Sequence, residues 1–334
     1  MNYQIEKKDL PALLQQWMQT AQVFAPVKVE NFTQFKALSS TNELVLNGPH
    51  NTRYPPKSLF LPQSETLLKY QDRDFTTTTL DNQQRIIFGI RPCDAHAVTL
   101  LDTVFDDQDN PDPYWKTRRE QTVLVGLGCN EPRETCFCTT VGSGPFDKSG
   151  LDILITALDD VYTLEVITEK GAQLVAELPS LEDDYQKQTL EVQDCALDYL
   201  HPAFETEGIK EKLYDIFESE YWQQVSQSCL GCGVCTFLCP TCFCFDIVDE
   251  TQRGERVRNW DTCMFRIYSQ EASGHNPRPT RSERTRQRLM HKYAYWLDQI
   301  EQIGCTGCGR CIHYCPVGID IREMIRNARV WREA

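Results

Sequence analysis

Short apolar runs alternate with amphipathic stretches in the first half of the chain. Residues 85–90 (RIIFGI) and 122–128 (TVLVGLG) are compact, apolar and rich in β-branched residues, which is typical of buried strands. Between them, Val98, Leu101 and Phe105 recur at helical spacing. A strand, a helix and a second strand in this order predict a right-handed βαβ unit whose two strands are parallel neighbours.

The flanking segments complete the pattern of the N-terminal part. Residues 151–168 consist of two apolar runs around a pair of aspartates, which predicts a β-hairpin. Residues 186–228 are acidic and have helical periodicity, so we expect a helical connector there. We therefore predict an α/β domain with a parallel sheet core over residues 1–185, followed by this connector.

The second half of the chain contains an internal repeat. The segment CLGCGVCTFLCP at 229–240 returns as CTGCGRCIHYCP at 305–316, with glycines at matching places and a terminal Cys-Pro. In two-cluster ferredoxins, three thiolates at C-x-x-C-x-x-C spacing bind one [4Fe–4S] cube, and the cysteine before proline binds the other. The spacing therefore predicts two crossed ligand sets, which are Cys229, Cys232, Cys235 and Cys315 for the first cluster, and Cys305, Cys308, Cys311 and Cys239 for the second.

Zinc is the alternative metal for such thiols. Structural zinc sites usually take their ligands as two separated pairs, whereas each run here supplies three thiols and exchanges the fourth. The pattern therefore favours iron–sulfur clusters, and we expect a mainly helical, two-cluster ferredoxin-like domain over residues 229–334. The whole chain is thus predicted to belong to the α+β class.

A long insertion, residues 245–304, separates the two cysteine runs and is predicted to be helical. Thr280 and Glu283 form a capping box, and the apolar residues after them recur at helical spacing. Arg284 and Arg288 lie beside this apolar stripe. Since a cube with four thiolates is net negative, these arginines are candidates for contacts with a cluster. A solvated basic face, or a patch for an acidic partner, is the equal alternative.

Four cysteines of the N-terminal domain are expected at the carboxyl edge of its sheet. Cys93 follows the first buried strand, Cys129 follows the second, and Cys136 and Cys138 come shortly afterwards. That edge is where open α/β sheets bind ligands. We therefore predict that these four thiols bind a third [4Fe–4S] cluster. Burial as small apolar side chains is the alternative for them.

Four cysteines remain outside these sets. Cys242, Cys244 and Cys263 are one thiolate short of a cube. We keep two interpretations for them, which are a metal site completed by a non-cysteine ligand, and hydrogen bonding or packing beside the first cluster. Cys195 lies in an acidic helical segment and is expected to be structural or free.

Composition and charge narrow the functional classes. The 334-residue chain carries a formal net charge of −14, which argues against binding to the phosphates of nucleic acid. Its apolar runs are too short to span a bilayer, and its first residues lack the apolar core of a signal peptide. Its 16 cysteines indicate metal binding in a reducing compartment, so we expect a cytoplasmic protein.

Several motifs resemble one family in their order along the chain. They are PPKSLFLPQSETLLKY, GIRPCDAHAVTLLD, GCNEPRETCFC, CPTCFCFD, RNWDTC, GHNPR, HKY and the second cysteine run. The chain resembles the β subunit of cytoplasmic sulfhydrogenases, which are NAD(P)-linked nickel–iron hydrogenases, and it is similarly close to the 4Fe-4S dicluster subunit of anaerobic sulfite reductase. The resemblance implies an iron–sulfur protein that passes electrons between two partners, one a flavin subunit, the other a catalytic metal subunit.

These observations favour an electron-transfer subunit without chemistry of its own. It would relay single electrons between a flavin/NAD(P)H-binding subunit, on one side, and a catalytic hydrogenase or sulfur- or sulfite-reducing subunit, on the other. No G-x-G-x-x-G turn is present, so we expect neither NAD(P) nor flavin in this chain. Two alternatives stay open. One is a catalytic subunit that uses an unusual cluster at Cys242, Cys244 and Cys263 on a sulfur substrate, and the other is a zinc-stabilised scaffold.

Overall fold

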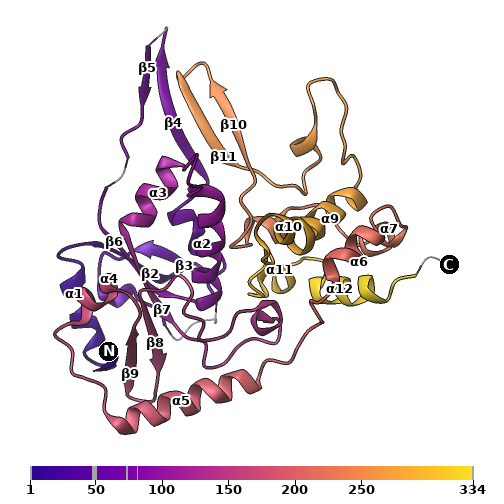
Figure 1. Cartoon of the computed structure of the whole chain (residues 1–334). Coiled ribbons are helices and arrows are strands. Elements are labelled where there is room, and N and C mark those ends of the chain that lie inside the picture. The colour runs from indigo at the N-terminus through magenta and orange to yellow at the C-terminus, as the bar shows by residue number, and fades with distance from the viewer. Residues whose placement is uncertain (1, 47–50, 73, 81, 333–334) are drawn as a thin grey trace. The chain divides into compact units, whose positions relative to one another are not determined.

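The chain divides into two compact units (Figure 1). A computed structural model of the protein describes residues 2–46, 51–72, 74–80 and 82–332. The first unit contains residues 1–60, 81–202 and 306–308, and the second contains residues 61–80, 203–305 and 309–334. This division differs from the linear order of domains in our prediction, because two segments leave their neighbours in sequence to pair with distant ones.

A seven-stranded sheet forms the centre of the first unit, in the order β1-β9-β8-β7-β6-β2-β3. Four central strands are parallel: β2 (Gln22–Val29), β6 (Arg85–Ile90), β7 (Thr122–Leu127) and β8 (Ile153–Ala157). Antiparallel strands flank them: β1 (Asn2–Glu6), β3 (Phe32–Ala37) and β9 (Val161–Val166). The predicted parallel neighbours β6 and β7, and the predicted hairpin of β8 and β9, are confirmed.

Helices of the first unit bury the sheet. Side chains alternate along β6, so Ile86 and Phe88 join a core cluster with Leu14 and Trp17, whereas Ile87 points to the other face. The helix predicted between β6 and β7 is present and contacts β7. The helices are α1 (Leu10–Trp17), α2 (Pro92–Phe105), α3 (Pro113–Glu120), α4 (Glu169–Val175) and α5 (Asp183–Asp198). Short 3₁₀ turns are η1 (Thr41–Glu43), η2 (Pro56–Leu59) and η3 (Cys138–Val141).

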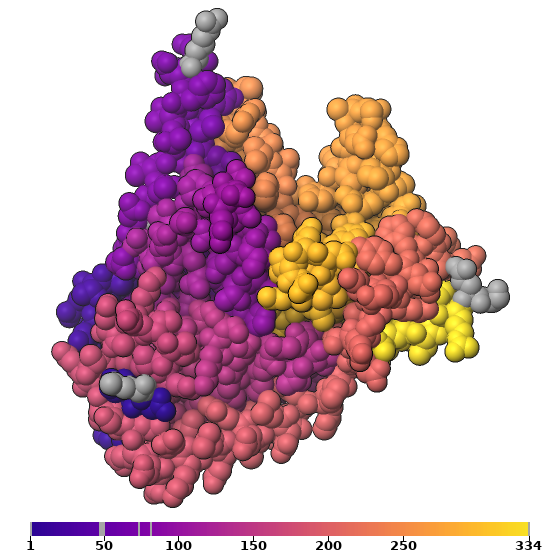
Figure 2. Space-filling view, in the orientation of Figure 1, coloured from indigo at the N-terminus to yellow at the C-terminus, as the bar shows by residue number. Residues whose placement is uncertain are grey.

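The second unit contains a four-stranded antiparallel sheet in the order β10-β11-β4-β5. Its strands are β4 (Ser64–Gln71), β5 (Asp74–Thr77), β10 (Phe245–Glu250) and β11 (Glu255–Trp260). The purple β4–β5 hairpin therefore lies against the orange β10–β11 hairpin, although they are far apart in the sequence (Figure 2). A buried ion pair of 2.6 Å joins Arg258 of β11 to Glu65 of β4.

This sheet corrects the prediction of a wholly helical insertion over residues 245–304. The first part of the insertion forms β10 and β11, because β4 supplies backbone partners from a segment some 190 residues earlier. Local pattern cannot reveal a partner at that distance. The later part is helical as predicted, and the capping box of Thr280 and Glu283 is present.

The helical part of the second unit surrounds the cysteine runs. A continuous helical segment consists of α9 (Arg281–Met290), a π-helical turn η5 (His291–Tyr295) and α10 (Trp296–Ile300). The other helices are α6 (Ile209–Asp215), α7 (Tyr221–Val225), α8 (Val234–Phe237), α11 (Arg310–His313) and α12 (Ile321–Val330), with a 3₁₀ turn η4 (Arg266–Ser269). Among the described residues, no helix is both long and apolar enough to cross a membrane.

Candidate metal centres

The two cysteine runs fold into the same turn. The glycines at the third and fifth positions of each run have positive φ, with 67° and 76° at Gly231 and Gly233 and 63° and 72° at Gly307 and Gly309. Residues with a Cβ are strained in this region, so glycine is required. A short helix follows each turn, and these two helices, α8 and α11, pack against each other. The repeat in sequence is therefore also a repeat in backbone geometry.

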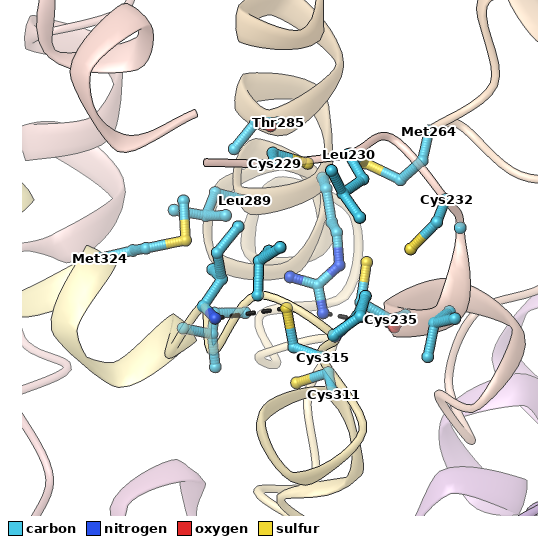
Figure 3. Close-up of a pocket in the computed structure, with 17 residues that line it drawn as sticks. Cys229, Leu230, Cys232, Cys235, Met264, Thr285, Leu289, Cys311, Cys315 and Met324 are labelled. Carbon is cyan, nitrogen blue, oxygen red and sulfur yellow. Dashed lines mark hydrogen bonds between the residues drawn. The ribbon is translucent and has the colours of Figure 1, made fainter. Parts of the chain in front are cut away.

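The four thiols predicted for the first cluster line one cavity in the second unit. Cys229, Cys232 and Cys235 come from the first run, and Cys315 comes from the second (Figure 3). Cys311 also reaches this cavity. Cys315 thus lies with three thiols from about eighty residues earlier, as the crossed arrangement of a two-cluster ferredoxin requires.

The surroundings of this cavity suit an iron–sulfur cube. The backbone N–H of Gly231 donates to Cys229 Sγ across 3.4 Å, and the N–H of Ile319 donates to Cys315 Sγ across 3.3 Å. Such bonds favour the thiolate form that binds iron. The rest of the wall is largely apolar, with Leu289 among its residues (Figure 3). Soft sulfur donors in an apolar wall match the ligand set of a [4Fe–4S] cluster.

Three thiols of the second predicted set gather in the second unit. Burial raises the pKa of Cys311 to about 12, and the nearby sulfur atoms of Cys305 and Cys239 add to this effect. Cys308, the fourth member, lies in the segment 306–308 that belongs to the first unit. Crowded, buried thiols are costly to ionise, and a bound metal removes that cost because it takes thiolate ligands.

Two buried cations lie beside these thiols. Burial alone would lower the pKa of Arg288, but Cys235 and Cys311 raise it well above its ordinary value. Burial likewise opposes the charge of Lys292, and the sulfur atoms of Cys239 and Cys242 raise its pKa above the ordinary range. The two residues are four positions apart and therefore share one helix face. This face presents positive charge to both cysteine runs.

Arg284 continues the same face towards the first cavity. Its side chain is 8% exposed and donates hydrogen bonds to the carbonyls of Arg278 and Pro279. Burial lowers the pKa of Arg284, whereas nearby Cys229 raises it. Arg288 is 6% exposed. Of the two interpretations of these arginines, a solvated basic face therefore does not describe the structure.

The N-terminal cysteines also lie close together, within the first unit. Burial raises the pKa of Cys138 to about 12, with contributions from the neighbouring sulfur atoms of Cys129 and Cys136. Cys93, at the start of α2, is buried, and its Sγ lies 3.9 Å from Asn51 Oδ1. These thiols follow β6 and β7 at the carboxyl edge of the sheet, where the sequence predicted them. Their ligation of a third cluster stays a prediction.

The carbonyl of Cys308 meets this N-terminal group. Asn51 Nδ2 donates to it across 2.9 Å, and Cys136 Sγ lies 3.9 Å from it. The N–H of Phe137 donates to the carbonyl of Gly307 across 2.8 Å. A predicted ligand of the second cluster is therefore hydrogen-bonded to the residues around the third set. Sequence analysis missed Asn51, because an isolated asparagine carries no ligand spacing.

The remaining cysteines separate into different places. Cys263 and Tyr268 both hydrogen-bond to Cys244, and the bond from Cys263 together with burial raises the pKa of Cys263. Cys242 instead lies near Lys292. Cys195 is exposed. In the part of the chain that the structure describes, no three His, Cys, Asp or Glu side chains are arranged to hold a single metal ion.

Comparison with known proteins follows this geometry. Residues 228–319 match the family model of the 4Fe-4S dicluster domain, and this range contains every cysteine of both runs. The chain is also 32% identical over 326 residues to the sulfhydrogenase 2 subunit beta of Pyrococcus furiosus, with 96% of each chain covered. The chain belongs to the sulfhydrogenase beta-subunit family. The resemblance found from the motifs is thereby confirmed.

As a member of this family with a dicluster domain, the protein has an iron–sulfur, electron-transfer character. The similarity to the sulfhydrogenase beta subunit extends through the N-terminal sheet as well as the cysteine runs, because it covers nearly the whole chain. No solved structure matches the chain. Cluster number and ligand sets therefore rest on the residues themselves.

Proposed function

We propose that this beta-subunit homologue is the electron-transfer subunit of a cytoplasmic, multisubunit oxidoreductase. It relays single electrons through [4Fe–4S] clusters between a flavin/NAD(P)H-binding subunit, at one end, and a catalytic hydrogenase or sulfur- or sulfite-reducing subunit, at the other. The observation that carries the proposal is the cavity shared by Cys315 and the three thiols of the first run. A bound [4Fe–4S] cube supplies one-electron transfer, which is the chemistry of ferredoxins.

The protein's own residues set the conditions for that transfer. The thiols bind the iron, and the glycine turns hold them at the spacing of a two-cluster ferredoxin. Arg288 and Lys292 supply positive charge beside the sulfur atoms, which favours the reduced and more negative state of a nearby cluster. The apolar wall excludes water and so strengthens this electrostatic effect.

Contacts around Cys308 support a relay with three stations. Cys308 is a proposed ligand of the second cluster, and its carbonyl contacts the Asn51 and Cys136 side chains of the N-terminal set. The crossed cysteines link the first and second clusters in the same way, because each run contributes to both. We therefore propose the order first cluster, second cluster, N-terminal cluster along the path of the electron.

A relay of this kind implies two partner surfaces. One would lie beside the first cluster, whose ligand Cys232 is exposed, and the other beside the N-terminal set. A flavoprotein suits one end, because flavin divides the two electrons of a hydride into single steps. The catalytic metal subunit suits the other end. The name of the Pyrococcus furiosus relative, a subunit beta, is consistent with a protein that works in an assembly.

The proposal is tested on the purified full-length chain under anaerobic conditions. We expect iron–sulfur absorbance that bleaches with dithionite, together with no turnover of hydrogen, NAD(P)H or sulfite. Addition of the copurifying subunits should restore turnover. Sustained turnover by the isolated chain would contradict a purely electron-transferring role, and zinc in place of iron would contradict the cofactor.

A further inference from the structure

Cys244 and Cys263 form a pair of neighbouring thiols in the second unit. The antiparallel register of β10 and β11 pairs Phe245 with Trp260, and the N–H of Asp261 donates to the carbonyl of Cys244 across 2.9 Å. The chain then reaches Cys263 two residues later, and its thiol hydrogen-bonds to the Cys244 sulfur. The hairpin backbone therefore fixes this approach of the two side chains.

The pair lies next to the first cluster site. The hydroxyl oxygens of Thr236 and Thr262 are 2.6 Å apart, and both residues are buried. Each threonine is adjacent in sequence to a cysteine, Cys235 in one case and Cys263 in the other. The Cys235 sulfur is also close enough to Cys263 to affect its ionisation. A predicted cluster ligand and the thiol pair are thus held side by side.

The two thiols differ in exposure and in hydrogen bonding. Cys263 is 7% exposed, whereas Cys244 is half-buried and accepts hydrogen bonds from Cys263 and from the Tyr268 hydroxyl. Two donors on one sulfur favour its thiolate, which is the nucleophile in thiol–disulfide exchange. Cys242 lies elsewhere, near Lys292. The arrangement is therefore an accessible nucleophile with a buried second thiol behind it.

We propose that Cys244 and Cys263 are a dithiol–disulfide couple that reduces small organic disulfides, with electrons drawn from the adjacent cluster site. The inference rests on the proposed function for its electron source. In the first step, the Cys244 thiolate attacks one sulfur of the disulfide RSSR, the S–S bond breaks, and RS⁻ leaves and takes up a proton.

The second step closes the internal disulfide. The Cys263 thiol loses its proton and attacks the Cys244 sulfur, which displaces the second RS⁻ as RSH. One RSSR has then gained two electrons and two protons, and the two cysteines have lost them. Two electrons from the relay, delivered singly, and two protons from water return the internal disulfide to two thiols.

The test uses the full-length, iron-loaded chain with bis(2-hydroxyethyl) disulfide as the probe. After treatment, free thiols are alkylated and linked peptides are mapped by mass spectrometry. We expect a Cys244–Cys263 link in the parent chain and a mercaptoethanol adduct on Cys244 in Cys263→Ser. Cys195→Ser, at an exposed thiol outside the pair, is the matched control and should form the same link as the parent. Absence of both link and adduct in iron-loaded chains would overturn the proposal.

Two further readouts separate this inference from the proposed function. Iron content in Cys244→Ser and Cys263→Ser should equal that of the parent, and loss of about four iron atoms would make the pair cluster ligands instead. In a stepwise dithionite titration, the internally linked parent should accept about two more electrons than Cys263→Ser. Equal uptake by the two chains, with cluster spectra intact, would overturn the couple and leave the electron-transfer role standing.

Discussion

Lys292 donates a hydrogen bond to the Thr241 hydroxyl across 2.7 Å, and both side chains are buried. The Thr241 hydroxyl also lies 3.3 Å from Cys239 Sγ and donates to the carbonyl of Gly304 across 2.7 Å. Gly304 directly precedes Cys305. The lysine is therefore a fixed cation between proposed ligands from both runs, and its contacts leave it little freedom to move away when a cluster changes charge.

Replacing this cation should change a cluster potential. Lys292→Met keeps the length of the side chain and removes its charge, so the reduced state of the second cluster loses a stabilising partner. We expect its potential to fall by on the order of 60–120 mV, which corresponds to about 1.4–2.8 kcal/mol for one electron. Redox titration followed by electron paramagnetic resonance measures the shift.

Arg286→Gln is the matched control for Lys292. Arg286 lies on the same helix, but its guanidinium donates to the carbonyl of Phe217 and pairs with Glu218, away from the thiols. This variant should leave the potential unchanged. An unaltered potential in Lys292→Met with full iron content would show that the buried lysine serves packing alone.

The crossed ligation predicts exchanged defects. Cys315→Ser should damage the cluster whose other three thiols belong to the first run, and Cys239→Ser should damage the other cluster. Each variant is compared by resonance spectra with Cys232→Ser, whose thiol belongs to the first set. We expect Cys315→Ser to match Cys232→Ser and Cys239→Ser to differ from both. The opposite pairing of spectra would refute the crossed assignment.

The third cluster predicts an iron count. Three cubes require about twelve iron atoms per chain, and Cys129→Ser should reduce this number to about eight. Cys129 lies beside Cys136 and Cys138, and its loss should leave the dicluster signals unchanged. Cys195→Ser serves as the control with full iron. An iron count near eight in the parent chain would remove the N-terminal cluster from the proposal.

The sequence predicted those parts of the site that depend on local pattern. The spacing of Cys229 to Cys239, repeated from Cys305 to Cys315, determines the two turns because each glycine position needs a positive φ. The strands before Cys93 and Cys129 were found from compact apolar runs, and the sheet orders them as parallel neighbours. Both signals lie within a few residues of the features that they predict.

The parts that escaped sequence analysis depend on contacts between distant segments. Residues 61–80 join the second unit because β4 pairs with β11, and neither strand contains a signal for the other. Asn51 binds the carbonyl of Cys308 across 257 positions of sequence. Lys292 was visible as a cation on a helix, but its burial beside Cys239 follows from tertiary packing.

Asp147 provides a test of stability against pH in the first unit. Burial opposes its ionisation, but hydrogen bonds from His96, Ser143 and Ser149 outweigh burial and hold its pKa well below the ordinary value. A depressed folded-state pKa stabilises the fold fully above the unfolded value near 4, and this contribution disappears as pH falls through the folded value. Asp147→Asn removes the charged acceptor, so we expect a loss of about 1–3 kcal/mol at neutral pH.

Thermal unfolding measures this effect for Asp147→Asn. The gap in melting temperature from the parent should be the same at pH 7 and pH 5, and it should narrow only on further acidification towards pH 4. Asp159→Asn, at an exposed turn of the same unit, should leave the melting temperature unchanged at all of these values. A gap that narrows between pH 7 and pH 5 would assign the dependence to His96 instead.

Equivalent glycines of the two runs should respond differently to the same substitution. Both Gly231 and Gly307 have positive φ, so alanine costs each about 1 kcal/mol in backbone strain. A Cβ at Gly231 would meet nothing closer than 3.7 Å, whereas a Cβ at Gly307 would lie 2.5 Å from the backbone of Phe137 and Cys138. Gly307→Ala must therefore displace the segment that carries Cys308. We expect Gly231→Ala to retain its iron and Gly307→Ala to lose about four to eight iron atoms, from the second cluster or from both the second and the N-terminal clusters. Equal iron contents in the two variants would mean that the contact between Gly307 and Phe137 is dispensable for both sites.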